Sequence, residues 1–308
     1  MRRAGIAATV CGLVATAPAL AACVPATTSA GARAVDAVVG TTPEPFGYTG
    51  AMVRYQVPDG VTSLAITARG GSGGTTNEPY LNVKAGGAAV TGTIAVQPGQ
   101  WLHISVAGEG ADAGSSDADP KGGWGGLSAV GGNGNAAKDD LRTSGAGGGA
   151  TTIQLTDINE NNPQTILVAG GGGGLGGPSG DPEFAGEGGT AGCTGDPSDS
   201  PAPSWTGSNG AHGSSIKGGK GGAAGGQPGM AGQRGSGGSG LGGNGAGGGG
   251  GVNGGNGGTG ASLTSAGGGG GAGSSATYGM TNTSISCAVD NDGAGIGNGQ
   301  VTVTPISL

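Results

Sequence analysis

The sequence predicts an all-β fold, an antiparallel sandwich or jelly roll into which glycine-rich polyproline II helices are inserted. Eight short segments alternate apolar and polar residues with a period of two, and turn-forming Pro, Asp and Gly residues separate several of them. Glycine accounts for 81 of the 308 residues, and it recurs at every third position in several runs. After a long glycine-rich stretch the chain returns to a strand pattern, which a disordered tail would not do.

The composition excludes several classes of protein. Aromatic residues make up 3% of the chain and charged residues 10%, so a conventional core cannot extend over its whole length. The formal net charge of −7 argues against nucleic acid as a partner, because nucleic-acid binding requires clustered Lys and Arg. Collagen is excluded because the glycines do not keep one phase and 16 prolines are too few.

The first 22 residues are predicted to be a lipoprotein signal peptide. Met1–Arg3 is basic, Ala4–Leu20 is apolar, and Leu20–Cys23 matches the bacterial lipobox pattern. This pattern implies cleavage before Cys23 and attachment of diacylglycerol to its sulfur. A plain secretory signal is an open alternative. A transmembrane anchor is the third, although the apolar run is short for a hydrocarbon core of about 30 Å.

Residues 23–45 are rich in Ala, Thr, Val and Pro and predict a flexible tether, and residues 46–308 form the domain. If Cys23 carries the lipid, Cys193 and Cys287 are free to form a disulfide, which an exported compartment permits. Two separate thiols are the alternative.

The predicted strands are distributed unevenly along the domain. Strands occupy much of residues 46–110 and 150–170, a mostly glycine-rich insertion covers 170–280, and closing strands lie in 281–308. The eight strands are Met52–Val57, Val61–Arg69, Ala88–Val96, Trp101–Ala107, Thr151–Leu155, Thr165–Ala169, Thr283–Val289 and Gln300–Ile306.

The glycine of the insertion is periodic rather than random. Between Gly242 and Gly260 every third residue is glycine. A polyproline II helix has three residues per turn, so this spacing gives it one edge without Cβ atoms, along which another backbone can approach closely. Such helices have no internal hydrogen bonds, and their buried amides must bond to neighbouring segments. The sequence therefore predicts a bundle of helices, with a solvated linker as the alternative.

Four stretches in order resemble a known family. They are Gln56–Leu64 (QVPDGVTSL), Val96–Gln100 (VQPGQ), Gly147–Ile153 (GGGATTI) and Ile166–Gly174 (ILVAGGGGG). Together they resemble the glycine-rich domain of the anaplastic lymphoma kinase and leukocyte tyrosine kinase receptor ectodomains and of many bacterial exported proteins. The resemblance implies a tumour-necrosis-factor-like sandwich with inserted polyproline II helices. In the receptors this ectodomain takes part in binding protein ligands. The kinase motifs His-Arg-Asp and Asp-Phe-Gly do not occur.

The sequence favours no catalytic residue, metal site or cofactor. His103 falls on the polar face of a predicted strand. Gly70–Gly74 matches the G-x-S-x-G pattern of hydrolases, but the helices of that fold are missing. Asp290–Gly293 resembles the start of a calcium loop but lacks the later glutamate.

These observations predict an exported, extracytoplasmic, membrane-tethered binding or adhesion module without enzymatic activity. Its partner would be a protein or glycan at the cell surface. Because glycine helices carry little side-chain chemistry, recognition is expected in loops, with Trp124 and Trp205 as candidate contact residues. The alternative for either tryptophan is that it covers the edge of the bundle. A structural spacer or surface-coat protein without a specific ligand is the alternative.

Overall fold

The computed structural model describes residues 42–76, 84–114, 119–135, 143–178, 191, 235–240, 245–258, 267–287 and 297–306. All of them belong to the unit Val38–Leu308. The predicted signal peptide and most of the predicted tether lie outside these residues. Within the described part of the chain, no helix has the length and apolar character needed to span a bilayer.

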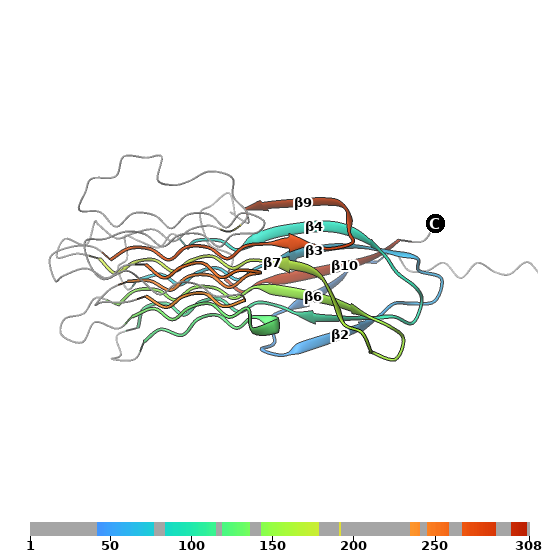
Figure 1. Ribbon diagram of the computed structural model, residues 1–308, viewed down its shortest axis with the longest axis horizontal. Coiled ribbons are helices and arrows are strands. Elements are labelled where there is room, and N and C mark those ends of the chain that lie inside the picture. The colour runs from blue at the N-terminus through green and yellow to red at the C-terminus, as the bar shows by residue number, and fades with distance from the viewer. Residues whose placement is uncertain are drawn as a thin grey trace, which may run out of the picture. The chain divides into compact units, whose positions relative to one another are not determined.

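Among the described residues, ten strands form two five-stranded antiparallel sheets, which confirms the predicted β-sandwich (Figure 1). The first sheet has the order β1 (Glu44–Gly47), β10 (Gln300–Ile306), β3 (Ser63–Arg69), β4 (Ala88–Ala95) and β9 (Thr281–Cys287). The second sheet has the order β2 (Met52–Gln56), β5 (Trp101–Ser105), β6 (Thr151–Thr156), β7 (Gln164–Ala169) and β8 (Ala276–Thr277). The helical structure among the described residues is one short 3₁₀ turn, η1 (Gly126–Ser128).

All eight predicted strands are present, with ends displaced by no more than two residues. Two further strands, β1 and β8, were not predicted, because no alternation of apolar and polar residues was detected in them. Strand β1 includes Glu44 and Pro45, which the sequence had placed in the tether, and its proline is tolerated because β1 is an edge strand. Strand β8 has only two residues.

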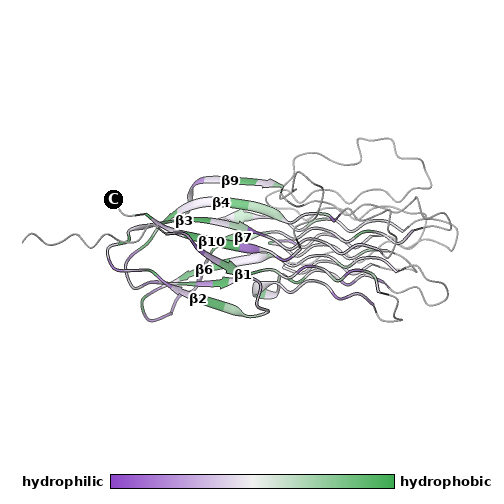
Figure 2. Ribbon diagram, turned by 180° about the vertical axis from the view of Figure 1, so that it is seen from behind, coloured by the Kyte–Doolittle hydropathy of each residue, from purple (hydrophilic) through white to green (hydrophobic). Residues whose placement is uncertain are grey.

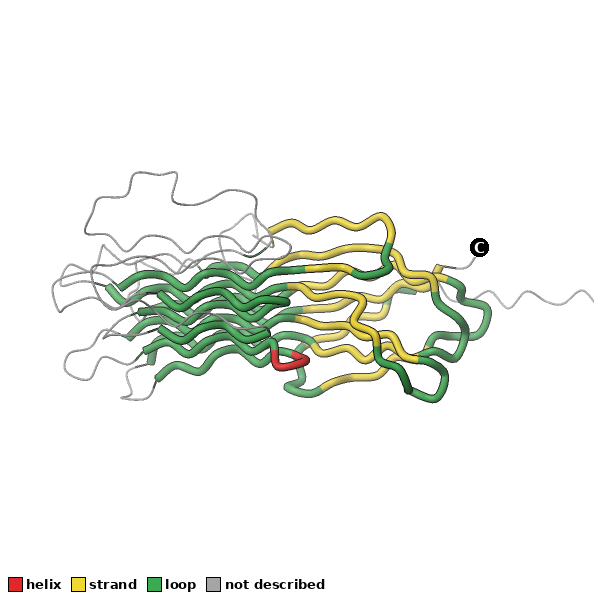
Figure 3. The backbone as a smooth tube through the Cα atoms, viewed as in Figure 1, coloured by secondary structure: helices red, strands yellow, loops and turns green. Residues whose placement is uncertain are grey.

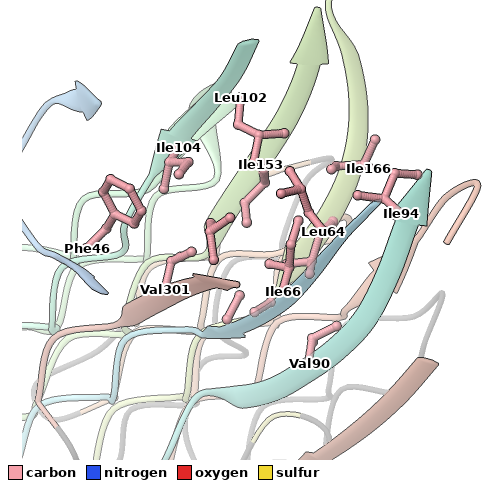
Figure 4. Packing of buried hydrophobic residues seen from close by; sticks show 14 of the residues in the cluster. Phe46, Leu64, Ile66, Val90, Ile94, Leu102, Ile104, Ile153, Ile166 and Val301 are labelled. Carbon is pink, nitrogen blue, oxygen red and sulfur yellow. The ribbon is translucent and has the colours of Figure 1, made fainter. Parts of the chain in front are cut away.

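The core lies between the two sheets and is built by the inward face of each strand (Figure 4). Leu64 and Ile66 of β3 are almost completely buried, as are Leu102 and Ile104 of β5. Each such side chain stabilises the fold by about 1.5–3 kcal/mol through removal from water. At one edge, Phe46 of the first sheet meets Tyr55 of the second edge-to-face, with ring centroids 6.1 Å apart. Figure 2 shows strongly hydrophobic residues on the strands of the sandwich.

The two ends of the sandwich differ in their connections (Figure 3). At one end the strands are joined by short turns, in which Gly60 and Gly99 adopt positive φ values of 80° and 83°. At the other end the strands continue into extended glycine-rich segments. We call these segments together the glycine lattice, defined as residues 70–76, 84–87, 106–114, 119–125, 129–135, 143–150, 170–178, 235–240, 245–258, 267–275 and 297–299.

Backbone hydrogen bonds within the glycine lattice recur every three residues. In segment 70–76, the first and fourth amides donate to the segment that leads into β4, whereas the second and fifth donate to the segment that leads into β6. These bonds are Gly70 N to Ala88 O at 3.0 Å, Gly73 N to Ala85 O at 2.9 Å, Gly71 N to Gly149 O at 3.0 Å and Gly74 N to Ala146 O at 2.7 Å. Successive residues of the segment therefore turn their amides toward different neighbours.

Two segments, 143–150 and 245–251, lie inside the lattice and each bonds to six described stretches of chain. Segment 143–150 donates to residues around 108–111, 129–135 and 172–175, and it accepts from residues around 71–74, 123 and 247–250. Segment 245–251 donates to residues around 268–271, 145–148 and 235–238, and it accepts from residues around 132, 171–174 and 255–258. Six neighbouring stretches thus supply the partners of each segment, and its buried amides and carbonyls are paired without a sheet ladder.

Glycine is required in this arrangement because neighbouring backbones approach too closely for a side chain. A Cβ atom added at Gly147 would overlap the carbonyl group of Gly248, and one added at Gly249 would overlap that of Gly171. Alanine occurs inside the lattice as well, and Ala146 and Ala246 are completely buried. The lattice is therefore selective about which positions carry a methyl group.

Candidate functional site: a neutral groove beside the glycine lattice

Trp124, one of the two candidate contact residues, is packed against a neighbour. Trp124 precedes η1 and is half-buried, and its ring centroid lies 6.3 Å from that of Tyr48 at an interplanar angle of 54°. The pair covers one edge of the lattice beside Gly108, whose added Cβ would contact the Tyr48 ring. Trp205, the second candidate contact residue, lies outside the described residues.

Of the cysteines with predicted roles, one falls within the described residues. Cys287 is the last residue of β9, is half-buried, and pairs in register with Ala88 of β4. Cys23 and Cys193 lie outside the described residues. Lipidation of Cys23 and a bridge between Cys193 and Cys287 therefore stay predictions.

The cavity that we consider the candidate site, the groove, has a volume of about 630 Å³ and lies where the second sheet meets the glycine lattice. The outer face of β6 and β7 forms the base of the groove, and η1 forms its rim. Lattice backbone forms one wall, and Tyr278, which follows β8, closes another side. The lining residues are Leu127, Ser128, Ala129, Thr152, Thr165, Val168, Gly235, Gly251, Val252 and Tyr278.

A register shift in β7 shapes the base of the groove. Thr152 of β6 pairs with Val168, whereas Gln154 pairs with Thr165, so one extra residue of β7 stands between the two pairs. Residues three apart in β7 therefore lie on the same outer face, where strict alternation would put them on opposite faces. The bulge places an apolar side chain, Val168, and a hydroxyl, that of Thr165, side by side at the base.

The rim is held in a strained backbone conformation. Leu127 and Ser128 have φ values of 53° and 65°, which L-residues with side chains rarely adopt. Gly126 packs so tightly on the sheet that an added Cβ would overlap the Thr152 hydroxyl and Ser105. Strain of this kind costs about 1–3 kcal/mol per residue and clusters at functional sites. The Leu127 side chain is 54% exposed at the rim of the groove.

Hydrogen bonds fix the rim and the wall relative to each other. The Ser236 hydroxyl donates to the Ser128 carbonyl at 2.7 Å. In the wall, Gly235 N donates to Val252 O at 3.1 Å, and Gly251 N donates to Gly235 O at 2.9 Å. The Tyr278 amide donates to the Ile166 carbonyl at 2.9 Å and anchors the side of the groove that Tyr278 closes. The groove is thus bounded by backbone that is already ordered.

The described residues of the lining carry no carboxylate, ammonium, guanidinium or imidazole group. One cluster of charged side chains lies instead among the lattice segments. There the Lys84 ammonium pairs with the carboxylates of Glu109 and Asp112, and Asp112 also accepts hydrogen bonds from Thr75. Burial lowers the pKa of Lys84, but the hydrogen bonds and charges of both carboxylates outweigh it and raise the pKa above its usual value.

A second charged cluster lies on the outer face of the second sheet, toward the short-turn end. His103 occupies the polar face that its sequence position predicted, and its Nε2 lies 3.1 Å from Glu160 Oε2. Arg54 Nη1 lies 3.2 Å from the other oxygen of the same carboxylate. Glu160 has a positive φ of 59° in the β6–β7 turn, which brings its side chain back over the sheet.

The serine of the G-x-S-x-G match is a lattice residue. Ser72 is 1% exposed, and its hydroxyl lies 3.1 Å from the carbonyl oxygen of Gly297. Among the described residues, no group of three or more His, Cys, Asp or Glu side chains is arranged to hold a metal ion.

Sequence reasoning missed the residues that line the groove. Leu127 and Tyr278 are far apart in the sequence and flanked by small residues, so neither belongs to a periodic segment. Their one distinguishing signal is size, because they are bulky apolar residues in the least apolar parts of the chain.

Comparison with known proteins gave no relative: no family model matches the chain, and no curated protein matches it.

Proposed function

We propose that this chain is an exported, membrane-tethered, non-catalytic binding or adhesion module, and that the groove is its recognition surface. One observation carries the proposal: an open groove of about 630 Å³ holds two large exposed apolar side chains, Leu127 and Tyr278, between a sheet and a rigid wall. Concave sites of this size, with apolar walls and a few placed polar groups, are typical of ligand binding.

The glycine lattice supports this role by ordering the wall before any ligand arrives. We propose that its segments are polyproline II helices, because their hydrogen bonds recur every three residues. A preorganised wall loses little entropy on binding. We further propose a jelly-roll sandwich of the tumour-necrosis-factor type, in line with the resemblance to receptor glycine-rich domains.

The direction of β1 supports a tethered arrangement. Glu44 pairs with Val303, whereas Gly47 pairs with Gln300, the residue that follows the lattice segment 297–299. The chain therefore enters β1 from the short-turn end of the sandwich and runs toward the lattice. A tether from a lipidated Cys23 would therefore enter the sandwich at its short-turn end.

The test is a binding screen with the full mature chain against arrays of cell-surface glycans and extracellular proteins. The proposal predicts saturable binding to at least one probe, lost when Leu127 and Tyr278 are both changed to Ala. Ile158→Ala is the matched control, since Ile158 is 62% exposed in the turn at the opposite end. Binding that survives the double change would refute the groove as recognition surface.

A structural spacer is the second candidate, favoured by the number of lattice bonds made between backbone groups alone. It predicts a folded protein that binds no probe in the same screen.

Tethering is tested separately. A Cys23→Ala change, or globomycin, should block processing and membrane retention of the chain, and unchanged retention would refute lipidation.

A further inference from the structure

We propose that the groove binds a neutral sugar ring, one hexose or N-acetylhexosamine unit of a glycan. This inference rests on the proposed function and names the ligand class of the same site. Three features of the lining lead to it: its neutrality, its mixture of apolar surface and hydroxyl groups, and its rigid form.

Neutrality excludes charged ligands. Phosphate, sulfate and carboxylate groups are recognised by Arg, Lys or His side chains, and none of these is among the described residues that line the groove. Lys84, Arg54 and His103 are each already within bonding distance of a carboxylate in the clusters described above. A charged ligand would therefore lose water in the groove without gaining a partner, which is unfavourable.

The mixture of surfaces matches a sugar better than a hydrocarbon. The Tyr278 ring and the Leu127 side chain present apolar surface on which the C–H face of a sugar ring can pack. The base and rim provide the hydroxyls of Thr152, Thr165 and Ser128. Within the described part of the chain no side-chain hydrogen bond engages the two threonine hydroxyls. An acyl chain covering them would bury them without partners, at a cost that a sugar hydroxyl avoids.

The form of the groove suits a small rigid ring. Its volume of about 630 Å³ falls in the range of small-molecule sites. The Ser236 bond to the rim and the paired amides of the wall hold two sides in place. A rigid ligand in a rigid site loses little entropy on binding, and a dissociation constant of about 1 mM for a single disaccharide is expected.

The experiment is saturation-transfer NMR on the full mature chain with six probes. Cellobiose, maltose, lactose and di-N-acetylchitobiose are the neutral probes, and sialyllactose and glucose 6-phosphate are the charged ones. We expect transfer to at least one neutral disaccharide and none to either charged probe. Tyr278→Ala should weaken the best neutral probe at least tenfold. Thr165→Val, which removes a hydroxyl with little change in shape, should weaken it several-fold.

Tyr48→Ala is the matched control, because Tyr48 is a comparably exposed tyrosine outside the groove, and it should leave binding unchanged. Failure of all neutral sugars, or binding that Tyr278→Ala leaves intact, would overturn the inference. The proposed function would survive that result if a protein probe still bound in a groove-dependent manner. It would fall too if no probe bound at all.

Discussion

Replacement of Gly249 by alanine tests how closely the backbones pack at an enclosed position of the glycine lattice. A Cβ at this residue would overlap the carbonyl group of Gly171 and come within 3.0 Å of that of Gly172. The segments have backbone neighbours on all sides, so the methyl group cannot be accommodated by rotating a side chain. Either the two segments separate or the inserted atom remains under strain.

The cost of this change follows from the bonds at the position. Overpacking of a close-packed interior costs about 1–3 kcal/mol. Separation would also weaken the two bonds that join these segments, Gly171 N to Gly250 O and Gly174 N to Gly247 O, both at 2.8 Å and each with a net contribution of about 0.5–1.5 kcal/mol. Gly249→Ala should therefore lower the free energy of unfolding by about 2–6 kcal/mol, a large share of the roughly 5–15 kcal/mol of an ordinary domain.

Urea unfolding followed by tryptophan fluorescence measures this loss, because Trp101 and Trp124 report on the sandwich and on the lattice edge. Gly47→Ala is the control, since a Cβ at Gly47 in β1 has no atom within 4 Å. It should change the free energy of unfolding by less than about 1 kcal/mol. If Gly249→Ala is as mild as the control, the close packing of the lattice is refuted.

Three further predictions concern other parts of the fold. Because folding raises the pKa of Lys84, its pairing with Glu109 stabilises the fold fully below pH 10.5, the ordinary pKa of a lysine side chain. This stabilisation is lost as the pH rises through the higher folded-state pKa. Titration of unfolding free energy should show a gap of about 1 kcal/mol between wild type and Lys84→Met that closes at alkaline pH, and a constant gap would contradict the pairing. Leu127→Gly should raise stability by about 1 kcal/mol in thermal unfolding, because glycine adopts φ near 53° without strain, and a loss would show that the exposed side chain packs. If Cys193 and Cys287 are bridged, Cys193→Ser should destabilise the oxidised protein by about 4 kcal/mol but leave the reduced protein unchanged, whereas equal stabilities under oxidising conditions would refute the bridge.

The sandwich was predictable because its strands are local patterns. The alternation in β3 and β5 put Leu64, Ile66, Leu102 and Ile104 on inward faces, and all four are buried. The start of β9 was displaced by two residues because its first residues are exposed and polar on both faces. Strand β1 was missed because a proline interrupts its four residues, and its position depends on pairing with β10 at the far end of the chain.

The groove was not predictable, because it exists only where distant segments meet. Val168 and Val252 lie in different glycine-rich surroundings, and the lattice brings both beside Ala129. The strained conformation of Leu127 leaves no trace in the sequence, since nothing in Gly-Leu-Ser specifies a positive φ. Trp124 had the expected location in a glycine-rich connection, but its contact with Tyr48 could not be inferred from spacing.

Amide hydrogen exchange within segments 143–150 and 245–251 tests most directly whether the glycine-rich part of the chain is an ordered, backbone-bonded lattice. The amides of these segments are bonded to surrounding segments, whereas Ile158 and Asn162 are exposed in the reference turn between β6 and β7, and their amides provide the internal reference. The account predicts exchange in both segments as slow as in the β3–β10 ladder, because lattice and sandwich open together. Exchange as fast as in the reference turn would contradict it.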